Sequence, residues 1–241
     1  MSDAMDRREG TIRTAFVLGA GLGLRLRPLT DDWPKPLLPV RGRPLMTYAL
    51  DHLLGVGVRR FIVNTHHRPE RYNQIFPDGR WRGVPLLFRH EPVLLNTGGG
   101  LKNIEDLLED DESLWVYNGD ILADLPLAPL RDGHGEGKQE VTLALRSRGP
   151  CRNVSVDGKG RICDFRFVLG APAVEFFQFT GIYLVRRSFL GRLRAGGRED
   201  LISVLLDRIR TEPGSIGHVV IDEGGWEDVG TLDAYEKVNR G

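Results

Sequence analysis

A glycine-rich segment near the start of the sequence is the part best suited to chemistry. The apolar run 14–18 leads into Gly-Ala-Gly-Leu-Gly, followed by Arg25 and, in a Pro-Lys-Pro context, by Lys35. A strand that ends in glycines exposes backbone N–H groups that can surround an oligophosphate. The two cations can neutralise charge on a transferred phosphoryl group, so they are the candidate catalytic residues. Nucleotide contacts are predicted from Leu18, Gly19, Ala20, Gly21 and Gly23.

Two better-known glycine loops do not fit this segment. In the dinucleotide pattern GxGxxG, the third glycine position holds Leu24, and the next strand ends at Asn64, where an acid is expected to bind the ribose hydroxyls. The pattern GxxxxGK[ST] of nucleoside triphosphatases does not occur in the sequence. A Rossmann oxidoreductase is therefore disfavoured. The simplest alternative to a phosphate site is a glycine-rich turn with solvated arginines.

Two aspartates that are far apart in the sequence are candidate metal ligands. Asp120 follows the apolar run 114–117, and Asp228 lies within Gly-Gly-Trp-Glu-Asp-Val-Gly. Both are expected in turns at the edge of an α/β sheet, where ligands bind. Mg²⁺ is commonly held by one or two carboxylates together with substrate phosphates, so two aspartates suffice. The alternatives are a helix cap at Asp120 and, at Asp228, a loop acid before a cap at Thr231.

A second glycine-rich segment, 96–100, precedes a helical pattern. Glycine backbone there can come close to a flat nucleobase, and the N-terminus of the helix favours anionic groups. We therefore predict nucleotide contacts from Thr97, Gly98 and Gly99. The alternative is an ordinary glycine-rich turn at the start of a helix.

The elements that position these residues follow from the apolar pattern, which predicts α/β structure in the first half of the chain. Alternating strands and helices indicate a Rossmann-like, doubly wound, mostly parallel sheet. Strands are predicted over 14–18, 60–64, 85–88 and 114–117, and helices from Pro44, from Pro69 and over 99–108.

The second half has a different pattern, in which strands follow one another through short turns. It indicates a small antiparallel lobe beside the parallel sheet. Strands are predicted over 139–146, 153–156, 161–168, 175–185 and 216–221, with a helix over 201–209 and a loop over 130–138. The aromatic residues at 165–167 and 176–177 are more typical of core than of a binding surface.

Composition limits the class of protein. The 241 residues suit one domain, and we expect a flexible segment 1–10 followed by a single domain over 11–241, with halves of about 11–135 and 136–241. Thirty-three basic and 33 acidic residues give no net charge that would favour nucleic acid or an anionic membrane. Cys151 and Cys163 are expected to be free thiols. With no signal sequence or membrane span in view, we expect a cytoplasmic monomer or small homo-oligomer.

Three ordered motifs together resemble one known family. The segment 18–45 is similar to the signature LAAGxGxRLxPLTxxxPKPLxPVxxxPL of nucleoside-diphosphate-sugar pyrophosphorylases, with Gly19 and Leu24 as departures. Asn118-Gly-Asp resembles the family's NGD metal motif, and the segment 226–231 resembles its WxDVGT motif. The second glycine segment resembles the ETGGG of short, single-domain members such as N-acetylmuramate 1-phosphate uridylyltransferases and mannose or heptose 1-phosphate guanylyltransferases, with Asn96 in place of the acid.

The resemblance implies the nucleotide-diphospho-sugar transferase fold, with nucleotide-binding and sugar-binding halves. It also implies an activity that condenses an NTP with a sugar 1-phosphate, with Asp120 and Asp228 as Mg²⁺ ligands, in the synthesis of cell-envelope or polysaccharide precursors. Asn118 is implied to bind nucleotide, Thr180 and Gly181 match the family's sugar-side TGIY strand, and Asn153 is a candidate partner for a sugar hydroxyl. No hexapeptide repeat occurs, so no acyltransferase domain is expected. The alternative function is a catalytically silent homologue that binds a nucleotide sugar and regulates a partner.

Overall fold

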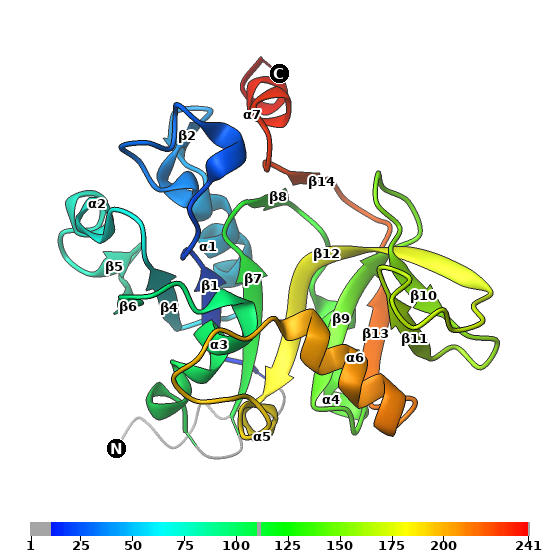
Figure 1. The fold of residues 1–241 in the computed structure, drawn as a ribbon. Helices are drawn as coiled ribbons and strands as arrows, with labels where there is room; N and C mark the ends of the chain where they lie inside the picture. The colour runs from blue at the N-terminus through cyan, green and yellow to red at the C-terminus, as the bar shows by residue number, and fades with distance from the viewer. Residues whose placement is uncertain (1–10, 110–111, 241) are drawn as a thin grey trace.

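A single ten-stranded mixed sheet extends through both halves of the protein (Figure 1). The structure is a computed structural model that describes residues 11–109 and 112–240, so the predicted flexible segment 1–10 lies outside the described residues. The strand order is β11-β10-β12-β7-β1-β4-β6-β5, with β9 beside β12 and β13 beside β9. The predicted fold class, a doubly wound and mostly parallel α/β sheet with a smaller antiparallel part, is confirmed.

The first half supplies the parallel strands, which are apolar runs, and all of them except the outer one over 84–90 are largely buried. The chain passes from β1 outward to β4 and β6, and then returns to place β7 on the other side of β1. The order therefore reverses between β1 and β7, which is the position where open α/β sheets bind ligands. The strands are β1 (Thr14–Leu18), β4 (Arg60–Thr65), β5 (Arg80–Trp81), β6 (Val84–His90) and β7 (Ser113–Asn118), and the helices are α1 (Met46–Gly55), α2 (Pro69–Ile75) and α3 (Asn96–Lys102).

The second half is built around one long strand, β12 (Glu175–Arg186), which pairs antiparallel with β7, β9 and β10. The last strand differs from the prediction, because β13 pairs parallel with β9, so this half is not wholly antiparallel. Its other elements are β9 (Val141–Arg146), β10 (Val154–Val156), β11 (Ile162–Phe165), β13 (Ile216–Val220), α4 (Ala128–Glu136), α5 (Arg187–Leu190), α6 (Leu201–Thr211) and α7 (Leu232–Arg240).

Helices cover both faces of the sheet, and each face has its own apolar core. One core joins residues from α3, α5 and α6 to the sheet, and the other joins residues from α1, α2 and α4 (Figure 1). Burial on both faces explains why the central parallel strands β1, β4 and β7 are continuous apolar runs rather than alternating ones. Among the described residues, no helix is both long and apolar enough to cross a lipid bilayer.

Three local predictions were wrong. Residues 130–138 are mostly helical, because α4 packs closely on the sheet: a Cβ at Gly133 would lie 2.8 Å from Val219. Glycine there permits contact rather than ending the helix. The helix predicted from Pro44 begins at Met46, because Arg43–Pro44 forms β3 against β2 (Pro39–Val40). The helix predicted over 99–108 is α3 followed by a separate 3-10 turn, η3 (Glu105–Leu107).

Candidate functional site

The glycine-rich loop begins where β1 ends, directly beside the end of β7. Leu18 pairs with Asn118 across these two strands, so the loop and the Asn-Gly-Asp turn start side by side. The N–H groups of Gly19 and Ala20 donate to Asn64 Oδ1, at 2.8 and 3.2 Å. Those two amides are therefore engaged by the protein itself, whereas those of residues 21–23 have no protein acceptor among the described residues. Phosphate contacts from the loop amides stay a prediction, and the amides left free to make them are those of residues 21–23.

The far side of this loop is fixed by a threonine that the sequence analysis did not single out. Thr30 is buried, and its hydroxyl donates to the carbonyl of Gly23 at 2.9 Å, while its own carbonyl accepts from His67 Nε2 at 2.8 Å. A Cβ on Gly23 would lie 2.8 Å from the Thr30 side chain, and its φ is +60°. Glycine is therefore required at position 23 for both conformation and space.

A short two-stranded ribbon brings the two candidate metal ligands together. Asp120 directly precedes β8 (Ile121–Ala123), and Asp228 ends β14 (Trp226–Asp228), which pairs antiparallel with β8. Asp228 lies opposite Ile121, and the N–H of Val229 donates to the carbonyl of Asp120 at 3.0 Å. The expectation that both aspartates lie in turns is wrong for Asp228, which belongs to a strand. No helix begins at Asp120, so it is not a helix cap.

The two candidate cations converge on these aspartates. Lys35 Nζ lies 2.5 Å from Asp120 Oδ2, and the lysine side chain is only 11% exposed. Asp228 Oδ1 and Arg25 Nη2 lie 2.7 and 2.9 Å from the position that a Cβ would occupy on Gly230, so they are close neighbours. Desolvation, and then the nearby Asp120 carboxylate, raise the pKa of Asp228, and the charges of Lys35 and Arg25 oppose them. All four side chains therefore belong to one electrostatic cluster.

This cluster suits a magnesium ion that is held jointly by protein and substrate. Two carboxylates on one ribbon provide hard oxygen ligands, and Mg²⁺ usually completes its shell with water and phosphate oxygens. Among the described residues, no group of three or more acidic, histidine or cysteine side chains is placed to hold a metal ion without substrate. The donor set thus fits the predicted Mg²⁺.

The second glycine segment forms the first turn of α3 and is packed against the loop before α6. Gly98 and Gly99 are buried, and both of their N–H groups donate to the carbonyl of Glu199. A Cβ at Gly99 would lie 2.6 Å from the carbonyl of Gly197, which explains the glycine. Any contact between this segment and a nucleobase is therefore not made by these two N–H groups. That Thr97, Gly98 and Gly99 bind nucleotide stays a prediction.

On the proposed sugar side, β12 bends beside the ribbon. The pairing with β9 shifts register between Phe179 and Tyr183, and Gly181 has φ +76°. A Cβ on Gly181 would lie 2.7 Å from Asn118 Nδ2, so this glycine lets β12 approach the predicted nucleotide residue closely. Thr180 is buried; its hydroxyl donates to the carbonyl of Ala144, and its carbonyl accepts from Trp226 Nε1 at 2.8 Å. The structure thus joins Thr180 to the ribbon and Gly181 to Asn118.

Other predicted features of the sugar side are less closely connected to the cluster. Asn153 precedes β10, and its carbonyl accepts from the N–H of Arg166. That its side chain binds a sugar hydroxyl stays a prediction. The prediction that the nearby aromatics are core is correct for Phe165 and Phe177 but wrong for Phe167 and Phe176. These two are 60% and 41% exposed, and their ring centroids lie 5.7 Å apart at the tip of the lobe.

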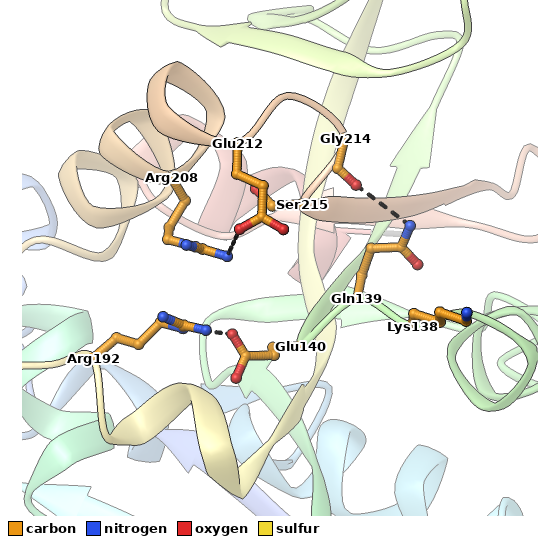
Figure 2. A pocket seen from close by; sticks show the side chains of 8 residues that line it. All are labelled: Lys138, Gln139, Glu140, Arg192, Arg208, Glu212, Gly214 and Ser215. Atoms are coloured by element: carbon orange, nitrogen blue, oxygen red, sulfur yellow. Dashed lines mark hydrogen bonds and ion pairs between the residues drawn. The ribbon is translucent and has the colours of Figure 1, made fainter.

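A separate cavity of about 290 Å³ opens at the opposite end of the strands, beside the first residues of β9 and β13. Figure 2 shows two ion pairs among its charged side chains, Arg192 with Glu140 and Arg208 with Glu212. None of the predicted site residues lines it. It is therefore not part of the candidate site.

Comparison with known proteins places the chain in a family. The nucleotidyl transferase family model matches residues 14–241, so the chain belongs to this family. It is 31% identical over 224 residues to mannose-1-phosphate guanylyltransferase of Mycobacterium tuberculosis, covering 92% of this chain and 62% of that protein. It is 29% identical over 247 residues to UTP–glucose-1-phosphate uridylyltransferase of Synechocystis, covering 94% and 62%. The chain thus spans about three fifths of the length of these relatives.

The fold is also found among solved structures. A putative glucose-1-phosphate thymidylyltransferase from Bacillus anthracis superposes with a TM-score of 0.79 at 20% identity, covering 95% of this chain and 94% of that one. At this identity the likeness concerns the fold. It agrees with the mixed, mostly parallel sheet described above.

Proposed function

We propose that this protein is a Mg²⁺-dependent sugar-1-phosphate nucleotidyltransferase, which condenses an NTP with a sugar 1-phosphate and releases pyrophosphate. The observation that carries the proposal is the convergence of Arg25, Lys35, Asp120 and Asp228 at the point where the sheet order reverses. Two cations, two metal-type carboxylates and free loop amides form a site for a reaction that is mainly positioning and charge stabilisation. The named activities of the two relatives point to the same class of reaction.

The proposed reaction is a direct in-line displacement. A phosphate oxygen of the sugar 1-phosphate bonds to the α-phosphorus of the NTP, and the bond from that phosphorus to the bridging oxygen of the β-phosphate breaks. The attacking phosphate is already anionic at neutral pH, so no side-chain base is required. The free amides of residues 21–23 and Arg25 hold the β- and γ-phosphates as negative charge grows on the leaving pyrophosphate. Lys35 neutralises the α-phosphate and the sugar phosphate.

Asp120 and Asp228 would hold the magnesium ion. When bound, the ion supplies positive charge to the reacting phosphates and fixes their orientation. Until then, the ammonium of Lys35 balances the carboxylate of Asp120. Asn118 would contact the nucleotide, while Thr180, Gly181 and Asn153 would face the sugar. A cytoplasmic enzyme, monomeric or in a small homo-oligomer, that acts on small molecules is part of this proposal.

The test is a pyrophosphate-release screen with four NTPs against a panel of sugar 1-phosphates, run with Mg²⁺ and with EDTA. GTP with mannose 1-phosphate and UTP with glucose 1-phosphate are the first pairs, because the two relatives are named for these substrates. Release that requires Mg²⁺ and both substrates is the expected result. Silence across the panel, with nucleotide sugars still raising the melting temperature, would favour the silent regulatory homologue instead.

The roles of single residues are tested by Arg25→Ala, Lys35→Ala and Asp120→Asn. Each is expected to lower turnover by about 100-fold or more, because Arg25 and Lys35 direct positive charge at the reacting phosphates and Asp120 would hold the magnesium ion. Circular dichroism should be unchanged, since Arg25 and Lys35 lie in short 3-10 turns and Asp120 lies in the turn after β7. Near-normal turnover in all three folded variants would refute the assignment of the site.

A further inference from the structure

A buried pair of polar side chains, Asn64 and Glu91, lies beneath both glycine segments. Asn64 is the next-to-last residue of β4 and is 2% exposed, and Glu91 follows β6 and is fully buried. Asn64 Nδ2 donates to Glu91 Oε1 at 2.8 Å. Burying polar groups of this kind destabilises the folded state unless each of them makes a hydrogen bond. The hydrogen-bond partners of the pair therefore show which segments it holds in place.

On one side, the pair holds the glycine-rich loop that follows β1. Asn64 Oδ1 accepts from the N–H groups of both Gly19 and Ala20. These bonds fix the loop as it leaves β1. They also determine which amides remain free, because the next three in the chain have no protein acceptor among the described residues. The amide of Asn64 can satisfy both neighbours only with its oxygen toward the loop and its nitrogen toward Glu91.

On the other side, the pair holds the approach to α3. Glu91 Oε2 accepts from the N–H of Leu95 at 2.9 Å, just before the second glycine segment begins. Gly100 in α3 packs directly on the pair, since a Cβ there would lie 2.9 Å from Asn64 Nδ2 and 3.0 Å from Glu91 Oε1. The same two side chains therefore fix both glycine segments.

We infer that Asn64 is a positioning residue. Together with Glu91 it fixes the glycine-rich loop after β1 and the α3 segment relative to each other, so that they form a single preformed nucleotide site. This inference rests on the proposed function. Asn64 touches no reacting atom; it acts by keeping the free loop amides where the triphosphate needs them. Binding to a site that is already ordered avoids the entropic cost of ordering it, so loss of this arrangement weakens nucleotide binding in particular.

Two isosteric substitutions test the inference. Asn64→Asp keeps the acceptor for Gly19 and Ala20 but places two carboxylate oxygens face to face at the present 2.8 Å contact. Glu91→Gln keeps the shape of the side chain, but its amide has only one oxygen. The amide nitrogen of Asn64 and the N–H of Leu95 then both face position 91, and one of them meets an amide nitrogen instead of an acceptor. Each change alone therefore leaves the network unsatisfied, with a cost typical of an unpaired buried polar group.

The double variant combines Asn64→Asp with Glu91→Gln and restores every hydrogen bond. The bond between the two side chains then runs in the opposite direction, with position 91 as the donor. The new amide nitrogen at position 91 donates to the new carboxylate at position 64, whose other oxygen still accepts from Gly19 and Ala20. The amide oxygen at position 91 accepts from Leu95, and the net charge of the network is unchanged. A merely destabilising pair of mutations would add their effects, whereas this pair must cancel them.

The experiment measures kcat and both KM values by pyrophosphate release, with the substrate pair that the wild-type protein turns over. Each single variant is expected to raise the KM for the NTP by about tenfold or more and to leave the KM for the sugar 1-phosphate within about twofold; the double variant should return the NTP value to within about threefold of wild type. Thr142→Val is the matched control, because it breaks another buried polar contact, to His134, far from both loops. Its KM for the NTP should not change.

The possible outcomes are distinct. An active wild-type protein whose folded single variants keep a normal KM for the NTP overturns the inference but not the function. A double variant whose KM for the NTP is no lower than that of the worse single variant also overturns the inference. This comparison is decisive even if one single variant fails to fold. A wild-type protein that is silent in the screen overturns the proposed function, and the inference falls with it.

Discussion

The imidazole of His134 makes the stability of this fold depend on pH, with a sign and size that follow from its surroundings. It lies on α4, 2% exposed, with Nδ1 hydrogen-bonded to Thr142 Oγ1 at 2.8 Å. Desolvation, and then the charge of Arg186, lower the pKa of His134 from 6.5 to about 4. Between these values the unfolded chain binds more protons than the folded one, so the stability is fully present above pH 6.5 and is lost as the pH falls toward 4.

The size of the effect follows from the same two pKa values. A difference of about 2.5 units corresponds to about 3 kcal/mol in the free energy of unfolding, of which about 2 kcal/mol is lost between pH 7.5 and about pH 5. Urea unfolding of the wild type and of His134→Asn over this range measures it. The variant is expected to be less stable at pH 7.5 but to lose about 2 kcal/mol less on acidification.

Comparison of the two proteins isolates this residue. Burial also lowers the pKa of His52 and of His218, but both residues are present in wild type and variant and cancel in the difference. If both proteins lose the same stability between pH 7.5 and 5, the imidazole of His134 is not held neutral by its surroundings, and the reasoning is wrong.

Four glycine substitutions give further tests. Gly181→Ala should destabilise the protein by about 2–4 kcal/mol in urea unfolding, because left-handed backbone strain adds to the clash with Asn118; Gly160→Ala, with φ +70° and no atom within 4 Å of its Cβ, should cost only about 1–2 kcal/mol. Equal losses would contradict the close approach of β12. Gly230→Ala should leave the melting temperature nearly unchanged but lower turnover about tenfold or more, because its Cβ displaces Arg25 and the Asp228 carboxylate, both flexible at their ends. Normal turnover would mean that these side chains need not be where the structure has them. Gly133→Ala should destabilise the protein by about 1–3 kcal/mol, since α4 cannot approach Val219 as closely; unchanged stability would show that the helix is free to shift.

The parallel strands were predictable because each is a continuous apolar run that ends in a turn or a polar residue. Thr14–Leu18 has its predicted bounds, and the strand predicted over 114–117 is longer by one residue at each end. Where glycine was interpreted only as a helix breaker, the prediction failed. In α4, Gly133 allows the helix to approach β13, and nothing local in the sequence distinguishes that use of glycine from a loop.

The candidate site was predictable in its members but not in its assembly. Arg25, Lys35, Asp120 and Asp228 lie together as their motifs indicate, yet the ribbon of β8 and β14 that joins them has only three residues in each strand, too short for a periodic pattern. In the sequence, Asn64 is distinguished only by standing where a dinucleotide-binding protein has an acidic residue. Its role depends on hydrogen bonds to residues 45, 44 and 27 positions away, which local pattern does not report.

The ribbon has a consequence for the order in which the protein is made. Asp120 and its partner Lys35 are synthesised well before β14, the strand that carries Asp228. A ribosome must therefore release β14 from its exit tunnel before the second carboxylate can reach the first. Until then the nascent chain can hold the lysine–aspartate pair but not the complete cluster of two cations and two carboxylates.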